Sequence, residues 1–131
     1  MDRKWWDAYF DEVASEFKGD RWGIINFNGI KRARLGACGN SGAGAILLAS
    51  ALGAKRIILL GYDCQLTGGK THWHGDHPPG MQGNAGSLPK WPKQFLNAKK
   101  KLNGVEVINA TRQTALNMFP RQRLEEALRC E

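Results

Sequence analysis

The chain has 131 residues, of which 42% are hydrophobic and 24% charged, and it carries a net charge of +7. This length is typical of one domain, and the composition excludes a disordered or fibrous protein. No apolar run approaches the roughly 20 residues that cross a bilayer, and no secretion signal begins the chain, which predicts a cytoplasmic protein with no membrane partner. Cys38, Cys64 and Cys130 lack a paired spacing, which indicates free thiols in a reducing compartment.

The positive charge favours phosphate-bearing ligands or polyanions. The basic residues are spread along the chain, however, and the densest run, Lys99 to Lys101, has the pattern of a solvated helix end. No nucleic-acid-binding motif accompanies the charge. The sequence therefore does not predict specific binding of DNA or RNA.

The first half of the chain predicts two helices and two short strands. Aromatic residues between positions 5 and 17 recur at helical spacing, which predicts an amphipathic helix whose aromatic stripe faces a core or a subunit interface. Residues 22–27 and 30–35 predict short strands on either side of an Asn-Gly turn. A glycine-rich segment then leads into an apolar helix that begins after Asn40 or Ser41 and ends at Gly53.

The second half predicts two buried strands and two further helices. The apolar run at residues 55–63 predicts a strand buried on both faces, as in a parallel sheet. Residues 64–89 form a long segment without periodicity, and the remainder predicts a helix at 90–104, a buried strand at 105–111 and a short terminal helix at 119–131. This order predicts a single α/β domain over residues 1–131, a Rossmann-like three-layer sandwich with a small, mainly parallel sheet.

Two positions along this pattern are candidate binding sites for a phosphate or a ribose. At the start of the second helix, unpaired N–H groups and the positive end of the helix dipole attract anions. The alternative is a plain N-cap with glycines for close packing. The candidate residues at this position are Asn40, Ser41, Gly42 and Gly44.

The ends of the two buried strands supply the second position. In open α/β sheets ligands bind beyond the carboxyl ends of the strands. Gly61, Tyr62 and Asp63 end the first strand, where Asp63 could hold a ribose hydroxyl or a metal and Tyr62 could stack on a base or donate to a phosphate. Arg112 ends the second strand and could bind a phosphate bidentately. The alternatives are a strand-end turn and a surface salt bridge.

The stretch THWHGDHPPG at residues 71–80 contains all three histidines of the chain. His72, His74, Asp76 and His77 have the ligand spacing of metallo-β-lactamase-type hydrolases and could bind a divalent metal such as zinc. No histidine follows His77, so the second half of a binuclear site is missing. A single metal ion held together with Asp63, a histidine acting as general base, and a hydrogen-bonded loop all remain open.

Three segments carry a resemblance. Residues 39–63 (GNSGAGAILLASALGAKRIILLGYD), 67–78 (TGGKTHWHGDHP) and 105–120 (VEVINATRQTALNMFP) resemble a family of uncharacterised phage and prophage proteins. More remotely, the helix–strand unit is similar to the Campylobacter-type bacterial sialyltransferases and to archaeal hydroxymethylpterin diphosphokinase-like domains. The resemblance implies a nucleotide pocket between the glycine-rich loop and the Gly-x-Asp strand end, and a bacterial host cell as the location.

The same resemblance implies a catalytic base among His72, His74 and His77. Such relatives begin with an additional strand, whereas this sequence starts directly before Trp5, so the expected sheet lacks that first strand. A sheet edge left open in this way could be covered by a second subunit, which predicts a homo-oligomer.

Three functional hypotheses follow. The first is a protein that binds a nucleotide or a nucleotide-sugar at the carboxyl edge of its sheet, with a transferase-like site formed by Asp63 and the three histidines. The second is a protein that holds a nucleotide-like molecule without turnover. The third is a metal-dependent phosphoesterase that uses the histidine loop.

Overall fold

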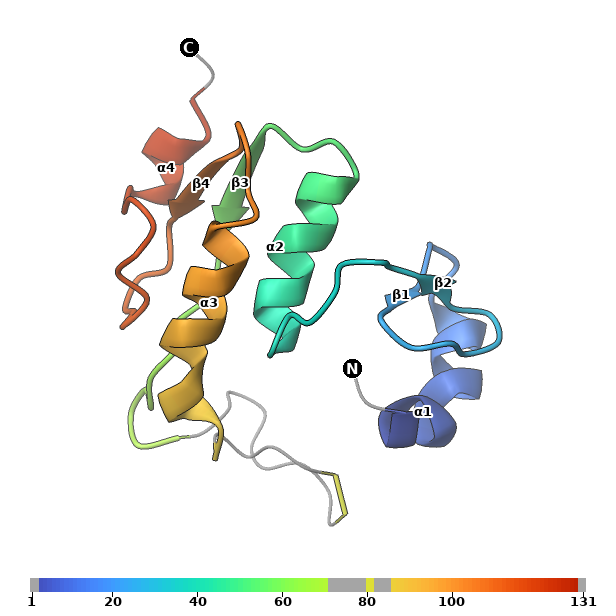
Figure 1. Cartoon of the computed structure of the whole chain (residues 1–131). Helices are drawn as coiled ribbons and strands as arrows, with labels where there is room; N and C mark the ends of the chain where they lie inside the picture. Colours follow the sequence, from blue (N-terminus) through green and yellow to red (C-terminus); the bar gives the residue numbers. More distant parts are fainter. Residues whose placement is uncertain (1–2, 71–79, 82–85, 130–131) are drawn as a thin grey trace.

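The computed structural model describes residues 3–70, 80–81 and 86–129 (Figure 1). The elements are α1 (Arg3–Glu16), β1 (Trp22–Gly23), β2 (Lys31–Arg32), α2 (Ser41–Ala51), β3 (Arg56–Leu59), η1 (Leu88–Lys90), α3 (Trp91–Lys99), β4 (Glu106–Asn109) and α4 (Leu124–Ala127). β1 pairs with β2 and β3 pairs with β4, both in parallel. Over these residues the chain mixes helices with small parallel sheets and forms no closed barrel, which confirms the α/β class.

Residues 3–34 form what we call the N-terminal unit, which consists of α1, β1 and β2. The indole of Trp6 is only 2% exposed and packs at ring-centroid distances of 6.4 Å from Phe10 and 6.1 Å from Phe27. Gly29 has a φ of 75°, and a side chain there would collide with the Phe10 ring. A small set of aromatic contacts therefore stabilises this unit.

The two strands of the N-terminal unit are shorter than the sequence pattern predicts. Only Trp22–Gly23 and Lys31–Arg32 are paired, and the rest of the WGIINF and IKRARL segments lies outside the strands. The chain turns between them, where the Ile30 N–H donates to the carbonyl of Phe27. Seven residues separate two parallel strands, so the chain must double back at once, which limits the pairing.

The described residues between 36 and 129 form the C-terminal unit, whose core lies between α2, α3 and the β3–β4 pair. Figure 1 shows α2 and α3 side by side against these strands. The buried residues of this core cluster come from the segment before α2, both helices, both strands and the segment after β4: Cys38, Ala43, Ile46, Leu47, Leu59, Phe95, Ala98, Val107, Leu116 and Phe119. Aliphatic packing of this kind is the main source of stability in a small domain.

The β3–β4 pair aligns Arg56 with Glu106 and Leu59 with Asn109. The prediction that the first strand is buried on both faces is correct only in part. Leu59 is 2% exposed, but Ile57 and Ile58 are half-buried and Leu60 is 57% exposed. β4 is the only described strand that pairs with β3, so the other edge of β3 carries no neighbour within the described part of the chain.

The second helix begins as its sequence predicts. Asn40 is the N-cap of α2, and its side-chain oxygen accepts the N–H of Ala43 at 2.8 Å. Its amide nitrogen donates to Gln94 of α3 at 2.8 Å, so the same side chain joins two helices. The helix ends at Ala51, and Gly53 then adopts a φ of 96°, a conformation that glycine tolerates best.

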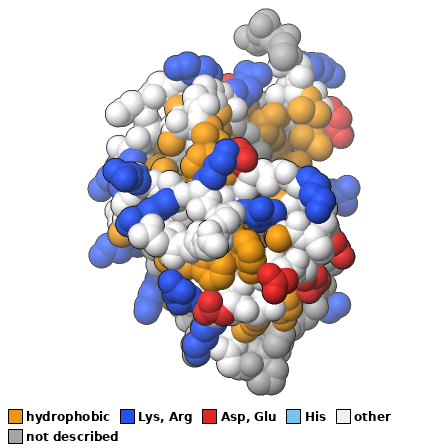
Figure 2. Space-filling view, turned by 90° about the vertical axis from the view of Figure 1, so that its right-hand side faces the viewer, with side chains coloured by type: hydrophobic (Ala, Val, Ile, Leu, Met, Phe, Trp, Pro, Cys, Tyr) orange, Lys and Arg blue, Asp and Glu red, His pale blue; other side chains and the backbone are white. Residues whose placement is uncertain are grey.

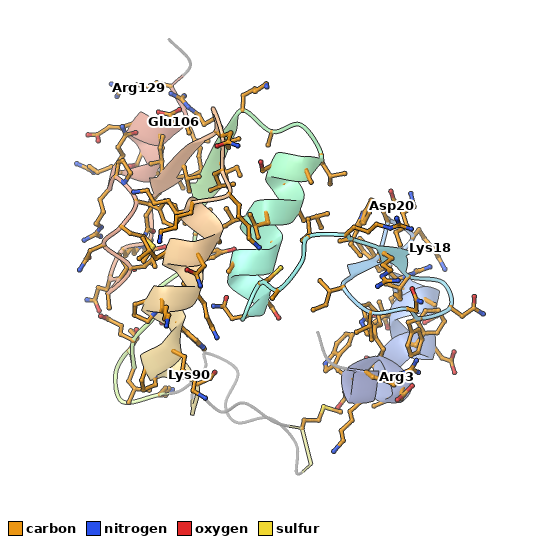
Figure 3. All side chains as sticks on the ribbon, viewed as in Figure 1. Arg3, Lys18, Asp20, Lys90, Glu106 and Arg129 are labelled. Atoms are coloured by element: carbon orange, nitrogen blue, oxygen red, sulfur yellow. The ribbon has the colours of Figure 1, made fainter. Side chains whose placement is uncertain are left out.

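The chain after β4 folds back along that strand. The Asn109 N–H donates to the carbonyl of Pro120 at 2.8 Å, and Asn109 forms a parallel bridge with Arg121. At the opposite, amino end of the strands, Arg56 pairs with Glu106, and Figure 3 shows Glu106 and Arg129 together there, far from Lys90. Among the described helices, none has the length and apolarity of a membrane span.

Candidate functional site

The carboxyl ends of β3 and β4 open into a groove, which we call the strand-end groove. Its volume is about 1210 Å³. Both strands contribute to it directly, since Leu60, Gly61 and Asp63 follow β3 and Ala110, Thr111 and Arg112 follow β4. The segment of residues 121–126 forms the facing wall. This is the edge of a parallel sheet at which ligands bind in open α/β folds.

Asp63 lies in this groove with its carboxylate held in one orientation. One carboxylate oxygen accepts the N–H of Cys64 at 2.9 Å, and the other accepts the hydroxyl of Thr67 at 3.0 Å. The side chain is half-buried and forms no salt bridge with a described residue. A carboxylate has about four acceptor positions, so Asp63 keeps capacity for the hydroxyl groups of a ligand.

Arg112 is exposed at the end of β4, and its side chain forms no ion pair with the residues that the structure describes. The surface salt bridge considered as an alternative is therefore not present among them. The backbone around Arg112 is held by Arg121, whose guanidinium donates to the carbonyls of Thr111 at 2.8 Å and of Arg112 at 3.0 Å. Arg112 thus presents a guanidinium that has no ion-pair partner in the described part of the chain, from a fixed backbone position.

A buried polar network supports the same edge of the sheet. Asn109 is completely buried, and it accepts the Thr111 N–H at 3.1 Å and donates to the Leu116 carbonyl at 3.1 Å. The Thr114 hydroxyl donates to the carbonyl of Tyr62, and the Tyr62 N–H donates to the Thr111 hydroxyl. These bonds join the ends of both strands, so the floor of the groove is preorganised.

Tyr62 does not face the strand-end groove. Its hydroxyl donates to the Gly42 carbonyl at 3.2 Å, and its ring packs edge-on against Phe95. A side chain at Gly42 would come within 3.0 Å of the Tyr62 ring, which explains the glycine there. Burial, and then the charge of Cys64, raise the pKa of Tyr62. Tyr62 therefore joins the strand end to the start of α2 and has its hydroxyl already engaged.

The start of α2 borders a different hollow, which we call the apolar pocket. It has a volume of about 820 Å³ and lies between the N-terminal unit and α2. Asn40, Ser41 and Gly44 line it, together with side chains of the N-terminal unit. A side chain at Gly44 would only meet Cys38 at ordinary contact distance, so this glycine is not needed for close packing.

The predicted binding residues thus divide between two hollows. Gly61, Asp63 and Arg112 line the strand-end groove, whereas Asn40, Ser41 and Gly44 line the apolar pocket. Gly42 and Tyr62 contact each other where the start of α2 meets the end of β3. The resemblance implies one pocket between the glycine-rich loop and the strand end, but the sequence does not show which side of α2 each residue faces.

The remaining predicted metal ligands and bases belong to the histidine loop. His72, His74, Asp76 and His77 fall outside the described residues. Within the described ranges, no three His, Cys, Asp or Glu side chains lie close enough together to hold a metal ion. The described residues therefore do not test the metal and general-base hypotheses, which stay predictions from the sequence.

Cys64 follows Asp63 in a conformation that non-glycine residues rarely adopt, with a φ of 52°. Burial and the neighbouring Asp63 carboxylate raise the pKa of the Cys64 thiol to about 11. A thiol with so high a pKa is almost wholly protonated at neutral pH, so Cys64 is not an activated nucleophile.

The predicted strand at 105–111 ends at Thr111, but the sequence pattern indicates neither Arg121 nor Thr114 as part of this edge. Both side chains donate to backbone carbonyls, across 9 to 52 residues of sequence separation. One signal was available, because Thr111, Arg112 and Thr114 place three polar side chains within four residues soon after β4. Comparison with protein-family models, curated proteins and solved structures gives no match.

Proposed function

We propose that the chain binds a nucleotide or a nucleotide-sugar in the strand-end groove. The observation that carries this proposal is that Asp63 and Arg112 both line one groove beyond the carboxyl ends of two parallel strands. A constrained carboxylate suits the hydroxyl groups of a ribose or a sugar, and a guanidinium without an ion pair among the described residues suits a phosphate. The net charge of +7 favours the approach of an anionic ligand.

The finer fold assignment belongs to the same proposal. In a Rossmann-like sandwich, helices cover both faces of a parallel sheet. In this chain α2 and α3 contribute side chains to the core cluster on one face of β3–β4, and successive side chains of a strand alternate between the two faces. Ile108 is 1% exposed although it lies outside that cluster, which supports a covered second face beside α4.

Transfer of a glycosyl or other group is the enzymatic form of this proposal. It requires a base, and the candidates from the sequence are His72, His74 and His77. Binding without turnover is the alternative form, and hydrolysis with a divalent metal at the histidine loop is the third. None of these forms changes the ligand chemistry expected at Asp63 and Arg112.

The test is isothermal titration calorimetry with a panel of nucleoside mono-, di- and triphosphates and nucleotide-sugars. We expect at least one compound to bind with one site per chain. Arg112→Gln should lower the affinity for phosphate-bearing ligands by about tenfold or more, because a charge-assisted contact is lost. Asp63→Asn should weaken ribosides more than inorganic phosphate.

Arg34→Gln is the matched control, because Arg34 is exposed, lies outside the groove and changes the net charge equally. Equal losses in the Arg34 and Arg112 variants would show that only the net charge matters. Failure of every compound in the panel to bind the unaltered protein would overturn the proposal.

Incubation of the bound compound with the protein, followed by product analysis with and without EDTA, separates the three forms. Turnover that EDTA abolishes supports the metal-dependent form. Turnover that resists EDTA and is lost when all three histidines are replaced by Ala supports a transferase-like base. Stable binding without any product supports the non-enzymatic form.

A further inference from the structure

The apolar pocket has the size and lining of a small-molecule site. Its volume of about 820 Å³ falls within the range of roughly 300–1,000 Å³ that is typical of ligand sites. Trp5 and Trp22 contribute wall from the N-terminal unit, and Leu48 contributes wall from α2. Figure 2 shows hydrophobic side chains gathered on the side of the molecule where the N-terminal unit lies, with basic and acidic side chains around them.

The described lining of this pocket contains few polar groups, and its only charge is positive. Lys4 is the one charged residue in its described lining, and that lining contains no Asp or Glu. A single cation beside a mostly aromatic and aliphatic wall is complementary to an apolar molecule that carries one negative charge. The strand-end groove differs, because its lining mixes arginines with acidic side chains.

A further feature of the wall favours an acceptor group on the ligand. The first turn of α2 contains no acidic residue, and Ser41 at its start lines the pocket, so the positive end of the helix dipole is not neutralised there.

We propose that the apolar pocket binds a small aromatic carboxylate, with its ring between Trp5, Trp22 and Leu48 and its carboxylate towards Lys4 and Ser41. This site is separate from the strand-end groove and does not depend on the proposed nucleotide ligand. The ligand bridges the N-terminal unit and α2, so its binding also stabilises the attachment of that unit.

The test compares two probes of equal shape, 1-naphthaleneacetate and its neutral amide, by calorimetry on the full chain. The acid should bind at one site per chain and more tightly than the amide by roughly fivefold. Lys4→Gln should remove this difference, because it lowers the affinity for the acid and leaves the affinity for the amide unchanged. Lys93→Gln, an exposed change outside the pocket, should alter neither.

Ala45→Trp tests the location, because Ala45 is an exposed residue of α2 that lines the pocket. A large side chain there should weaken both probes by more than tenfold without loss of far-ultraviolet circular dichroism. Unchanged binding in this variant, or equal loss of acid and amide in Lys4→Gln, would overturn the proposal. So would the absence of any saturable binding to the unaltered protein.

Sedimentation velocity distinguishes another occupant of the same surface. If the unaltered chain is a dimer that Ala45→Trp converts to a monomer, a second copy fills the pocket and the proposal is wrong. Binding of the acid to an Asp63→Asn/Arg112→Gln variant should be unaffected. Loss there would place the probe in the strand-end groove and would contradict a separate site.

Discussion

The N-terminal and C-terminal units are stabilised in different ways. The C-terminal unit has a continuous core to which two helices and two strands contribute, and its strand ends are joined by a buried polar network. The N-terminal unit has one deeply buried large side chain, Trp6, and two strands of two residues each. It is attached to the rest of the chain by sparse contacts between elements.

This difference shows where a rigid site can form. A binding site needs side chains held by a preorganised backbone, and the strand-end groove has one because Asn109, Thr111 and Thr114 tie its floor together. The apolar pocket has one firm wall, α2, and one wall that belongs to the weakly attached unit. Binding at the groove should therefore leave the fold unchanged, whereas binding at the pocket should order it.

The largest expected effect comes from the aliphatic core of the C-terminal unit. Leu59→Ala removes a side chain that is 2% exposed, and it should lower the free energy of unfolding by about 3 kcal/mol through lost burial and a cavity. Urea unfolding followed by circular dichroism measures this change. A loss below about 1 kcal/mol would show that this core is not the main source of stability.

Asn109 tests the polar network beneath the groove. Asn109→Ala leaves the Thr111 N–H and the Leu116 carbonyl without their partner, and each loss costs about 1 kcal/mol or more. We expect a total loss of roughly 2–3 kcal/mol by urea unfolding, together with weaker binding at the strand-end groove. Asn103→Ala, an exposed change near the start of β4, should alter stability by less than about 0.5 kcal/mol.

Trp6→Phe should have a much smaller effect than the size of the side chain suggests. The change removes ring volume, which destabilises, but it also removes a buried N–H that has no partner among the described residues. The two terms are of similar size, so the free energy of unfolding should change by less than about 1 kcal/mol. Trp6→Ala also removes the unpartnered N–H, but it removes the whole ring as well, so it should lower the free energy of unfolding by about 3 kcal/mol. Equal losses in both variants would mean that the indole N–H is satisfied in solution.

The smallest expected effect is a pH dependence that arises in the C-terminal unit. The pKa of Cys64 is raised from 9.0 to about 11, mainly by burial, so the folded state holds the thiol proton more tightly than the unfolded state. This contribution to stability is complete below pH 9 and is lost as the pH rises towards 11. Cys64→Ala should flatten the dependence over this range. If the free energy of unfolding of Cys64→Ala falls with pH as steeply as that of the unaltered chain, the dependence arises from other groups.

The sequence predicted α2, β3 and β4 because their signals are local and strong, whereas α3 and α4 are shorter than the helices predicted at 90–104 and 119–131. The Asn40 cap, the apolar run of α2 and the glycine after it define a helix without reference to the rest of the chain. The runs that form β3 and β4 were likewise predicted as strands, and their parallel pairing follows from the intervening helix. The two-sided burial of the first run was partly wrong, since burial of Leu60 depends on a neighbour that β3 does not have among the described strands.

The N-terminal unit and the division of the site could not be predicted in the same way. The strands there end after two residues because the chain must reverse between them, which is a tertiary constraint. Whether Asn40 and Asp63 share one hollow depends on the position of Tyr62, whose hydroxyl donates to Gly42 across 20 residues of sequence. Periodicity and spacing contain no information on such a contact.

The most direct test of the central claim is a titration of the ¹⁵N-labelled chain with the tightest nucleotide of the calorimetric panel, followed by amide chemical shifts. The account predicts saturable shifts at Gly61, Asp63 and Arg112, which follow the ends of β3 and β4. The amides of Ser41 and Gly44, beside the apolar pocket, should not move. Shifts confined to the start of α2, or no saturable shift at the strand ends, would contradict a nucleotide site in the strand-end groove.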